Sequence, residues 1–285
     1  MDSRSPFDAL LPREIAGKAE DAGVAKSAQD ALTTLALAVL AGAFISMGAA
    51  FSTVVGTGLA QAVPFGVARL LTGLAFSLGL ILVVVGGAEL FTGNNLLIMA
   101  YASRKVTAAG VLRNWVLVYT GNLIGAFLTA AGMYAAGLHL LGDGQVGRQA
   151  LLIAEAKCSL SWDTALLRGV FCNALVCLAV WLCMSCRSTG DKLLAVLFPV
   201  TAFVAMGFEH SIANMYFVPA ALFVKVLAPE AYWTDLGLTP HALAHVEPDT
   251  FVLKNLIPVT IGNVIGGAVL VGSAYWFIFR RPRPN

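Results

Sequence analysis

The sequence predicts an all-α membrane protein with six transmembrane helices, arranged as two inverted three-helix repeats. Hydrophobic residues make up 58% of the chain and charged residues only 12%, where soluble domains have about 45–50% and about 25%. Six apolar runs are long enough to cross a bilayer. The last three runs repeat a pattern of the first three, and an odd number of spans per repeat forces the second copy to lie upside down.

The composition also excludes other classes. A soluble core of 285 residues could not bury this much apolar surface, and the mean hydropathy is +0.80, so we expect a lipid bilayer around the chain. The net charge is only +2. The basic residues are scattered over loops instead of forming one stripe, which argues against a nucleic-acid partner.

The chain divides into three regions. Residues 1–30 are rich in charge and predict a cytoplasmic N-terminal segment without a secretory signal. Residues 31–280 contain all six spans and predict a single channel domain. Residues 281–285 form a short cytoplasmic tail.

A short amphipathic helix is predicted within residues 5–24. Pro12 suits a first helical turn, and Gly23 is expected to end the helix. Four apolar residues recur on one face: Leu11, Ile15, Ala19 and Ala22. The helix is expected to lie at the membrane surface. A more specific alternative is that it covers the cytoplasmic mouth of a pore.

The loops between the spans carry a charge bias. The spans lie at about 32–56, 67–101, 110–138, 163–186, 193–227 and 252–279. Basic residues follow the second and fourth spans and end the chain: Arg104, Lys105, Arg187, Lys192, Arg280, Arg281 and Arg283. The loop at 228–251 contains four acidic residues and no Lys or Arg. The positive-inside rule therefore places both termini in the cytoplasm.

The second and fifth spans are each interrupted by polar residues. The interruptions read GGAELFTGNN at 86–95 and GFEHSIAN at 207–214. They align with each other, Glu89 with Glu209 and Asn94 with Asn214. Paired broken helices in an inverted repeat indicate the path of the solute.

The third and sixth spans match each other even better. Val-Leu-Arg-Asn precedes Gly-Asn-Leu-Ile-Gly at 111–125, and Val-Leu-Lys-Asn precedes Gly-Asn-Val-Ile-Gly at 252–266, with the same spacing. The paired glycines of these steps predict close contact between helices, not transport.

Three ionisable side chains lie deep within the apolar spans: Glu89, Glu209 and His210. A charge at the bilayer centre costs at least about 2.5–3.5 kcal/mol, so such residues face a cavity or the interior of the bundle. For the two glutamates we expect a structural role, with each carboxylate accepting hydrogen bonds from backbone N–H groups freed at its helix break. His210 breaks the repeat symmetry, because its counterpart is Leu90, and this favours a functional role.

The imidazole of His210 could act as a neutral hydrogen-bonding group or as a cation. Thr92 and Asn214 could supply hydrogen bonds beside it, and the helices resuming after the breaks would add partial positive charge. No carboxylate cluster prepares a cation site. These observations favour an anion as the solute.

Catalytic, metal and cofactor sites are not expected. The five cysteines are expected to pack as small buried residues: Cys158, Cys172, Cys177, Cys183 and Cys186. His241 and His245 have helical spacing, but a solvated loop is the favoured interpretation, and His139 lies at the end of a span. No catalytic triad, Walker loop or cofactor fingerprint has a suitable context, so an enzyme is not predicted.

The chain resembles the formate/nitrite transporter family. The stretches that carry this resemblance are GGAELFTGNN at 86–95, NWVLVYTGNLIGA at 114–126, NALVCLAVWL at 173–182, GFEHSIANM at 207–215 and NLIPVTIGNVIGG at 255–267. SPFDALLP at 5–12 and FSLGLIL at 76–82 place it nearest the formate-channel branch. One departure is Gly93-Asn94-Asn95, which stands where that branch has small hydroxylated residues.

The resemblance implies an aquaporin-like protomer that forms a homopentamer in the bacterial inner membrane, each protomer with its own pore. It implies passage of formate and other small monovalent anions, either through a passive channel or together with protons. By position, His210 is the central pore histidine, and Thr92, Glu209 and Asn214 surround it. The remaining carried-over residues are the vestibule residue Lys157, the polar fourth-span residue Asn173, and the apolar constriction of Phe76, Leu80, Leu90 and Phe203.

A mechanism follows as a hypothesis. A bare anion cannot cross a dry ring of Phe and Leu without losing hydration that nothing replaces. Lys157 would concentrate the anion, and an imidazolium at His210 would protonate it to a neutral acid. Replacing His210 with Phe or Asn would then abolish proton-coupled uptake.

Three alternatives remain at this point. Nitrite or hydrosulfide could be the anion, since each is small and conjugate to a weak acid. A neutral-solute channel of aquaporin type would have Asn-Pro-Ala motifs at both breaks, and the sequence has none. A receptor or scaffold protein would have little need of symmetric helix breaks and a buried histidine.

Overall fold

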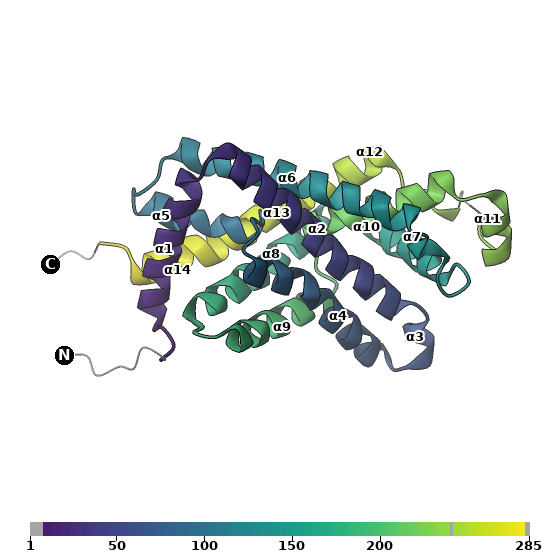
Figure 1. The fold of residues 1–285 in the computed structure, drawn as a ribbon, viewed down its shortest axis with the longest axis horizontal. Coiled ribbons are helices and arrows are strands. Elements are labelled where there is room, and N and C mark those ends of the chain that lie inside the picture. Colours follow the sequence, from purple (N-terminus) through teal and green to yellow (C-terminus); the bar gives the residue numbers. More distant parts are fainter. Residues whose placement is uncertain (1–7, 240–241, 283–285) are drawn as a thin grey trace.

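The fold is a bundle of long helices, several of them interrupted (Figure 1). The computed structural model describes residues 8–239 and 242–282. Every regular element within these ranges is helical, as the fold class predicts. The first and last helices, α1 and α14, lie at the same end of the molecule (Figure 1), which agrees with an even number of crossings.

The first repeat consists of seven elements, of which η1 is a 3₁₀ helix. In chain order they are α1 Pro12–Ala28, α2 Ala31–Gly56, α3 Leu59–Ala62, α4 Phe65–Gly86, η1 Gly93–Leu97, α5 Ile98–Ala102 and α6 Ala108–Ala135.

The second repeat begins after α6, and its last span contains two π-helical segments, η4 and η5. Its elements are η2 Leu138–Leu140, α7 Gln145–Cys158, α8 Trp162–Ser185, α9 Thr189–Ala205, α10 Ser211–Leu227, α11 Glu230–Leu236, α12 Pro248–Thr250, η4 Phe251–Leu256, α13 Ile257–Val264, η5 Ile265–Ser273 and α14 Ala274–Phe279.

Five helical segments in the described part of the chain are long and apolar enough to cross a membrane on their own. A sixth passes the same test only when α10 is counted with α11, to which it is bent by 110°. The predicted fifth span contains no single helix that is long enough by itself. Its break divides it into α9 and α10, of 17 residues each. Both predicted breaks are present.

Each break begins at a glycine in the left-handed region of backbone space. Gly87 has φ +75° and Gly207 has φ +71°, a conformation that other residues adopt only with strain. The helix ends there, and an extended segment follows before helix resumes at Gly93 in the first repeat and at Ser211 in the second. The two repeats therefore turn the chain by the same means.

The N-terminal helix α1 extends four residues beyond its predicted end. Pro12 occupies its first turn as predicted, but Gly23 lies inside the helix and does not end it. A Cβ at Gly23 would approach the Cβ of Ala100 to 2.9 Å. Gly23 therefore serves close packing of α1 on α5. Residues 5–7 of the predicted helix lie outside the described residues.

A buried carboxylate attaches α1 to the C-terminal end of the chain. Glu20 is fully buried and pairs with Lys105 at 2.8 Å and Arg280 at 2.9 Å. The Ser103 hydroxyl also donates to it. Burial raises the pKa of Glu20, but the hydrogen bonds from Arg280, Lys105 and Ser103 outweigh burial and lower that pKa below its usual value.

The paired Gly-x-x-x-Gly steps hold the third span of each repeat against the first. A Cβ at Gly125 of α6 would overlap the carbonyl oxygen of Val39 in α2, and one at Gly266 would overlap that of Val170 in α8. The predicted close helix contact is thus confirmed, and it recurs in both repeats.

We expect Gly125→Ala to disrupt the contact of α6 with α2, because the added methyl has no space. The folded protein should lose several degrees of melting temperature, in line with the cost of about 1–3 kcal/mol for overpacking. Gly132→Ala is the matched control on the same helix, since no atom lies within 4 Å of its Cβ position. Equal melting temperatures for the two variants would contradict the prediction.

We expect Glu20→Gln to loosen α1, because the charge-assisted hydrogen bonds to Arg280 and Lys105 are lost. Amide hydrogen exchange in α1 should become about tenfold faster. Asp21→Asn is the control, since the Asp21 side chain is 78% exposed. The lowered pKa means that the contribution of Glu20 is present above the ordinary glutamate range. It should be lost only as pH falls through the lowered value. Protection factors, which correct for the base-catalysed intrinsic exchange rate, should therefore fall on the acid side, and a fall on the alkaline side instead would contradict this.

Candidate functional site

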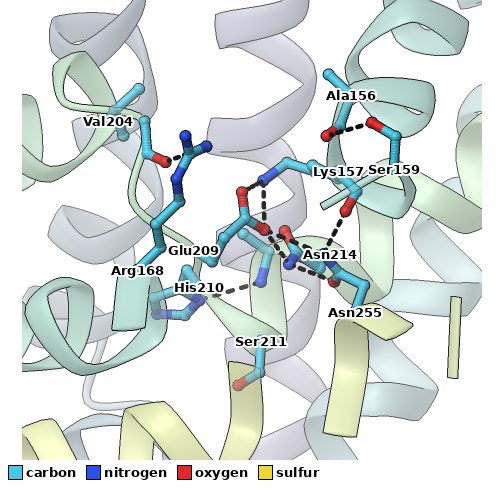
Figure 2. A network of polar contacts seen from close by, with 12 residues as sticks. Ala156, Lys157, Ser159, Arg168, Val204, Glu209, His210, Ser211, Asn214 and Asn255 are labelled. Carbon is cyan, nitrogen blue, oxygen red and sulfur yellow. Dashed lines mark hydrogen bonds and ion pairs between the residues drawn. The ribbon is translucent and has the colours of Figure 1, made fainter. Parts of the chain in front are cut away.

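The second helix break carries a network of polar side chains centred on Glu209. The Lys157 ammonium lies 3.0 Å and 3.1 Å from the two carboxylate oxygens. Asn214 donates to the same carboxylate at 2.7 Å and to the amide oxygen of Asn255 at 2.7 Å. Figure 2 shows these side chains converging from α7, α10 and the last span.

The first break carries the same network, built from equivalent residues. Lys26 lies 2.6 Å from the Glu89 carboxylate. Asn94 donates to that carboxylate at 2.6 Å and to Asn114 at 2.9 Å. Lys26 therefore corresponds to Lys157, and each lysine lies in the last turn of a helix that precedes the first span of its repeat. The internal repeat thus includes α1 and α7.

The prediction that backbone N–H groups donate to the Glu89 and Glu209 carboxylates is wrong. Their carboxylates bind Lys and Asn side chains, and the backbone of each break is satisfied by a different asparagine. Asn122 accepts from the Phe91 N–H and donates to the Glu89 carbonyl, at 2.9 Å each. Asn263 accepts from the Ser211 N–H at 2.9 Å and donates to the Glu209 carbonyl at 3.0 Å. Each amide thus replaces the missing helical hydrogen bonds on both sides of a break.

His210 caps the helix that resumes after the second break. Its Nδ1 accepts a hydrogen bond of 3.0 Å from the Ala213 N–H. A nitrogen that accepts carries no proton, so this contact defines a neutral ring with its proton on Nε2. Nε2 lies 3.1 Å from the Thr92 hydroxyl of the first break. The two breaks therefore meet at a His–Thr hydrogen bond.

One cavity lies at each of the two breaks. The Lys157 cavity, of about 230 Å³, is lined by Phe76, Phe203, Glu209 and His210 among others. The Lys26 cavity, of about 210 Å³, is lined by Leu80, Leu90 and Glu89 among others. All four residues of the predicted apolar constriction are buried. Each lines one cavity, so these apolar side chains separate the two.

Aromatic rings surround His210 on the side of the Lys157 cavity. The rings of Phe203 and His210 are stacked with centroids 6.0 Å apart, and Phe76 meets Phe203 edge-on at 5.7 Å. The imidazole therefore lines the Lys157 cavity beside two aromatic rings.

Two predicted site residues lie elsewhere than expected. The side chain of Asn214 belongs to the Glu209 network and donates to Glu209 and Asn255 instead of the imidazole; only the Asn214 backbone N–H contacts His210, at its carbonyl. Asn173 is fully buried and lines neither cavity. It donates to the Thr92 carbonyl at 3.3 Å and to Asn95 at 2.9 Å. It therefore holds the first break by hydrogen bonds outside both cavities.

Sequence reasoning missed several residues of the site. Lys26 precedes the first apolar span, so the similarity between the spans of the two repeats does not reach it. Arg69 and Arg168 also line the Lys157 cavity, although their positions near the ends of spans gave no such signal. The four repeat asparagines were visible as repeated letters, but their contacts require the fold: Asn114, Asn122, Asn255 and Asn263.

The remaining candidates take structural positions. All five cysteines are free, and four of them are buried. His139 stacks on Tyr134 with ring centroids 4.4 Å apart. His245 Nδ1 lies 2.5 Å from Glu155, while His241 lies outside the described residues. No group of three or more His, Cys, Asp or Glu within the described ranges could hold a metal ion.

Comparison with known proteins identifies relatives over nearly the whole chain. A family model described as "Formate/nitrite transporter" matches residues 13–277. The formate channel FocA of Escherichia coli K12 is 44% identical over 281 residues, which cover 99% of this chain and 98% of FocA. The formate channel FocA of Haemophilus influenzae is 36% identical over 93% of both chains.

Solved structures agree with this result. A pentameric formate channel with formate bound has a TM-score of 0.83 and 45% identity, over 88% of this chain and 98% of that one. An ion channel of the same family has a TM-score of 0.78 and 26% identity, over 93% of this chain and 98% of that one. These matches confirm the predicted family and fold.

We expect Glu209→Gln to destabilise the protein, because it leaves the Lys157 ammonium, whose side chain is only 16% exposed, without a counter-charge. Removing one partner of a buried pair costs about 3–5 kcal/mol. The Lys157→Met, Glu209→Gln double variant should recover part of the melting temperature. Glu89→Gln is the matched comparison and should cost less, since the Lys26 side chain is 30% exposed. A double variant no more stable than Glu209→Gln would contradict the prediction.

Proposed function

The chain belongs to the formate/nitrite transporter family, and on that basis we propose that it carries formate and other small monovalent anions of weak acids across the membrane. The observation that supports this most directly is the pair of cavities, one at each break, that are separated by a neck of Phe and Leu side chains, while the breaks meet at the His210–Thr92 contact. Such a neck admits a solute of few atoms and excludes large ones.

The apolar neck supports passage of the neutral acid in preference to the bare anion. Phe76, Leu80 and Phe203 offer no hydrogen bonds to replace lost hydration, and an unpaired charge there would cost many kcal/mol. Protonation to formic acid removes that charge. The proposal therefore couples each formate to one proton.

Of the two forms considered for the His210 side chain, a neutral ring and an imidazolium, the geometry supports the neutral ring. An imidazolium would carry a proton on Nδ1 and lose the hydrogen bond from the Ala213 N–H. The neutral ring keeps this cap and presents its Nε2–H beside the Thr92 hydroxyl. We propose that these two groups hydrogen-bond the permeating acid, while the proton joins the anion in the hydrated cavity.

Assembly and orientation follow as further parts of the proposal. A solved relative with 45% identity is described as pentameric, which supports a homopentamer. The charge bias of the loops supports cytoplasmic termini and insertion in a bacterial inner membrane. The Lys157 cavity then opens outward, and residues 31–280 act as one transport unit. The matched relatives are described as channels and transporters, which supports a transporting role.

The competing substrates are tested directly. Purified protein in proteoliposomes should take up radiolabelled formate faster at lower external pH, because more of the anion is protonated. Nitrite, hydrosulfide and acetate added as competitors rank the anions. Swelling with water or glycerol at a rate above that of protein-free liposomes, without formate uptake, would reject the proposal in favour of a neutral-solute channel.

We expect His210→Phe to lose formate uptake, because it removes both the cap and the Nε2–H donor. His210→Asn keeps a capping side chain and should retain pH-dependent uptake at a rate reduced about tenfold, in line with one lost hydrogen bond. Uptake by His210→Asn that no longer varies with pH would show instead that the imidazole itself delivers the proton.

A further inference from the structure

The Lys157 cavity carries an excess of positive charge that the Lys26 cavity lacks. Its charged lining residues are Arg69, Lys157, Arg168 and Glu209. Because Lys157 is paired with Glu209, the two guanidinium groups account for the excess. The charged lining residues of the other cavity are Lys26 and Glu89, and they pair with each other.

The two guanidinium groups lie close together beside Gly207. A Cβ built on Gly207 would be 3.4 Å from Arg69 Nη2 and 4.0 Å from Arg168 Nη1, so these nitrogens are no farther apart than the sum of those distances. Figure 2 shows Arg168 and Lys157 approaching the Glu209 carboxylate from opposite sides. Among the described residues, no carboxylate pairs with either guanidinium.

The two arginines differ in how their donors are used. Arg69 binds the end of α9, donating from Nε to the Ala205 carbonyl at 2.9 Å and from Nη2 to the Val204 carbonyl. Arg168 makes one long hydrogen bond of 3.4 Å, from Nη1 to the Gly207 carbonyl. A guanidinium has five N–H donors in a planar fork. Most of those on Arg168 are therefore available to a ligand.

Comparison of the repeats shows that the scaffold does not require an arginine at this position. The carbonyl of Arg168 accepts the Glu209 N–H at 3.3 Å, and in the other repeat the carbonyl of Leu37 accepts the Glu89 N–H at 3.2 Å. Leu37 thus holds its break through the same backbone contact without a charged side chain. The Arg168 guanidinium is an addition to the shared architecture.

We propose that Arg168, supported by Arg69, is a carboxylate-binding station in the Lys157 cavity, with no counterpart in the Lys26 cavity. The fork of Arg168 matches the planar carboxylate of formate. His210 lines the same cavity, so an anion bound to Arg168 lies in the cavity that leads to the apolar neck. This inference rests on the proposed function for its physiological ligand.

The paired guanidinium groups also fit a small dicarboxylate such as oxalate. One carboxylate binds Arg168 and the other lies near Arg69. A dianion cannot cross the apolar neck, so it occupies the station without being carried. Oxalate is therefore a probe of binding that does not depend on transport.

The first test measures binding of radiolabelled oxalate to the purified full-length protein by equilibrium dialysis. Arg168→Leu installs the residue type of the equivalent Leu37, so it should fold, and it should weaken oxalate binding about tenfold. Arg168→Lys keeps the charge and should bind more tightly than Arg168→Leu. Arg148→Leu removes a positive charge of α7 that lines neither cavity and is the control. Equal binding by the wild type and Arg168→Leu would overturn the proposal.

The second test measures formate uptake into right-side-out and inverted vesicles. Arg168→Leu should raise the half-saturating formate concentration about tenfold at the face with the Lys157 cavity and leave the other face unchanged. An equal rise at both faces would overturn the station. Lack of formate uptake by the wild type, with Arg168-dependent oxalate binding, would reject the proposed function and retain the station.

Discussion

The structure depends on satisfying the backbone where two helices break inside the membrane. Lipid offers no hydrogen bonds, so each N–H or C=O freed by a break must find a partner within the protein. Asn122 and Asn263 supply these partners from the third span of each repeat. The glycine steps beside them allow α6 and α13 to approach the first spans closely enough for a short amide to reach. The backbone hydrogen bonds at the breaks therefore form only if the helices pack closely at the glycine steps.

The breaks in turn determine where charge can be buried. Each glutamate leaves its helix at the break and meets a lysine from the helix that precedes the repeat, and an asparagine one turn farther on joins them. Because the two repeats are inverted, these pairs lie at opposite ends of the path. These contacts agree with the structural role expected for Glu89 and Glu209 from the sequence, but they use side-chain partners that no local pattern indicates.

The internal sequence repeat predicted the architecture well and the side-chain contacts poorly. Span positions, both breaks and the asymmetry of His210 follow from local patterns, since hydropathy and glycine placement act over a few residues. Lys26 and Arg168 could not be assigned, because their roles depend on contacts with residues 63 and 39 positions away. Gly23 was misread for the same reason: a helical glycine ends a helix or admits a neighbour, and only Ala100 of α5 decides between them.

The departures from symmetry occur near the two breaks. The symmetric parts, the asparagines and the lysine–glutamate pairs, hold the broken helices. The asymmetric parts lie where the breaks meet and in the Lys157 cavity: in the alignment His210 corresponds to Leu90, Thr92 to Ile212, and Arg168 to Leu37. Leu90, Ile212 and Leu37 at the equivalent positions show that the repeated scaffold does not need these three side chains at both breaks. Their chemistry, a neutral donor pair at the neck and a guanidinium at one mouth, therefore makes the two ends of the path unequal. The anion meets a charged cavity on one side and a compensated one on the other.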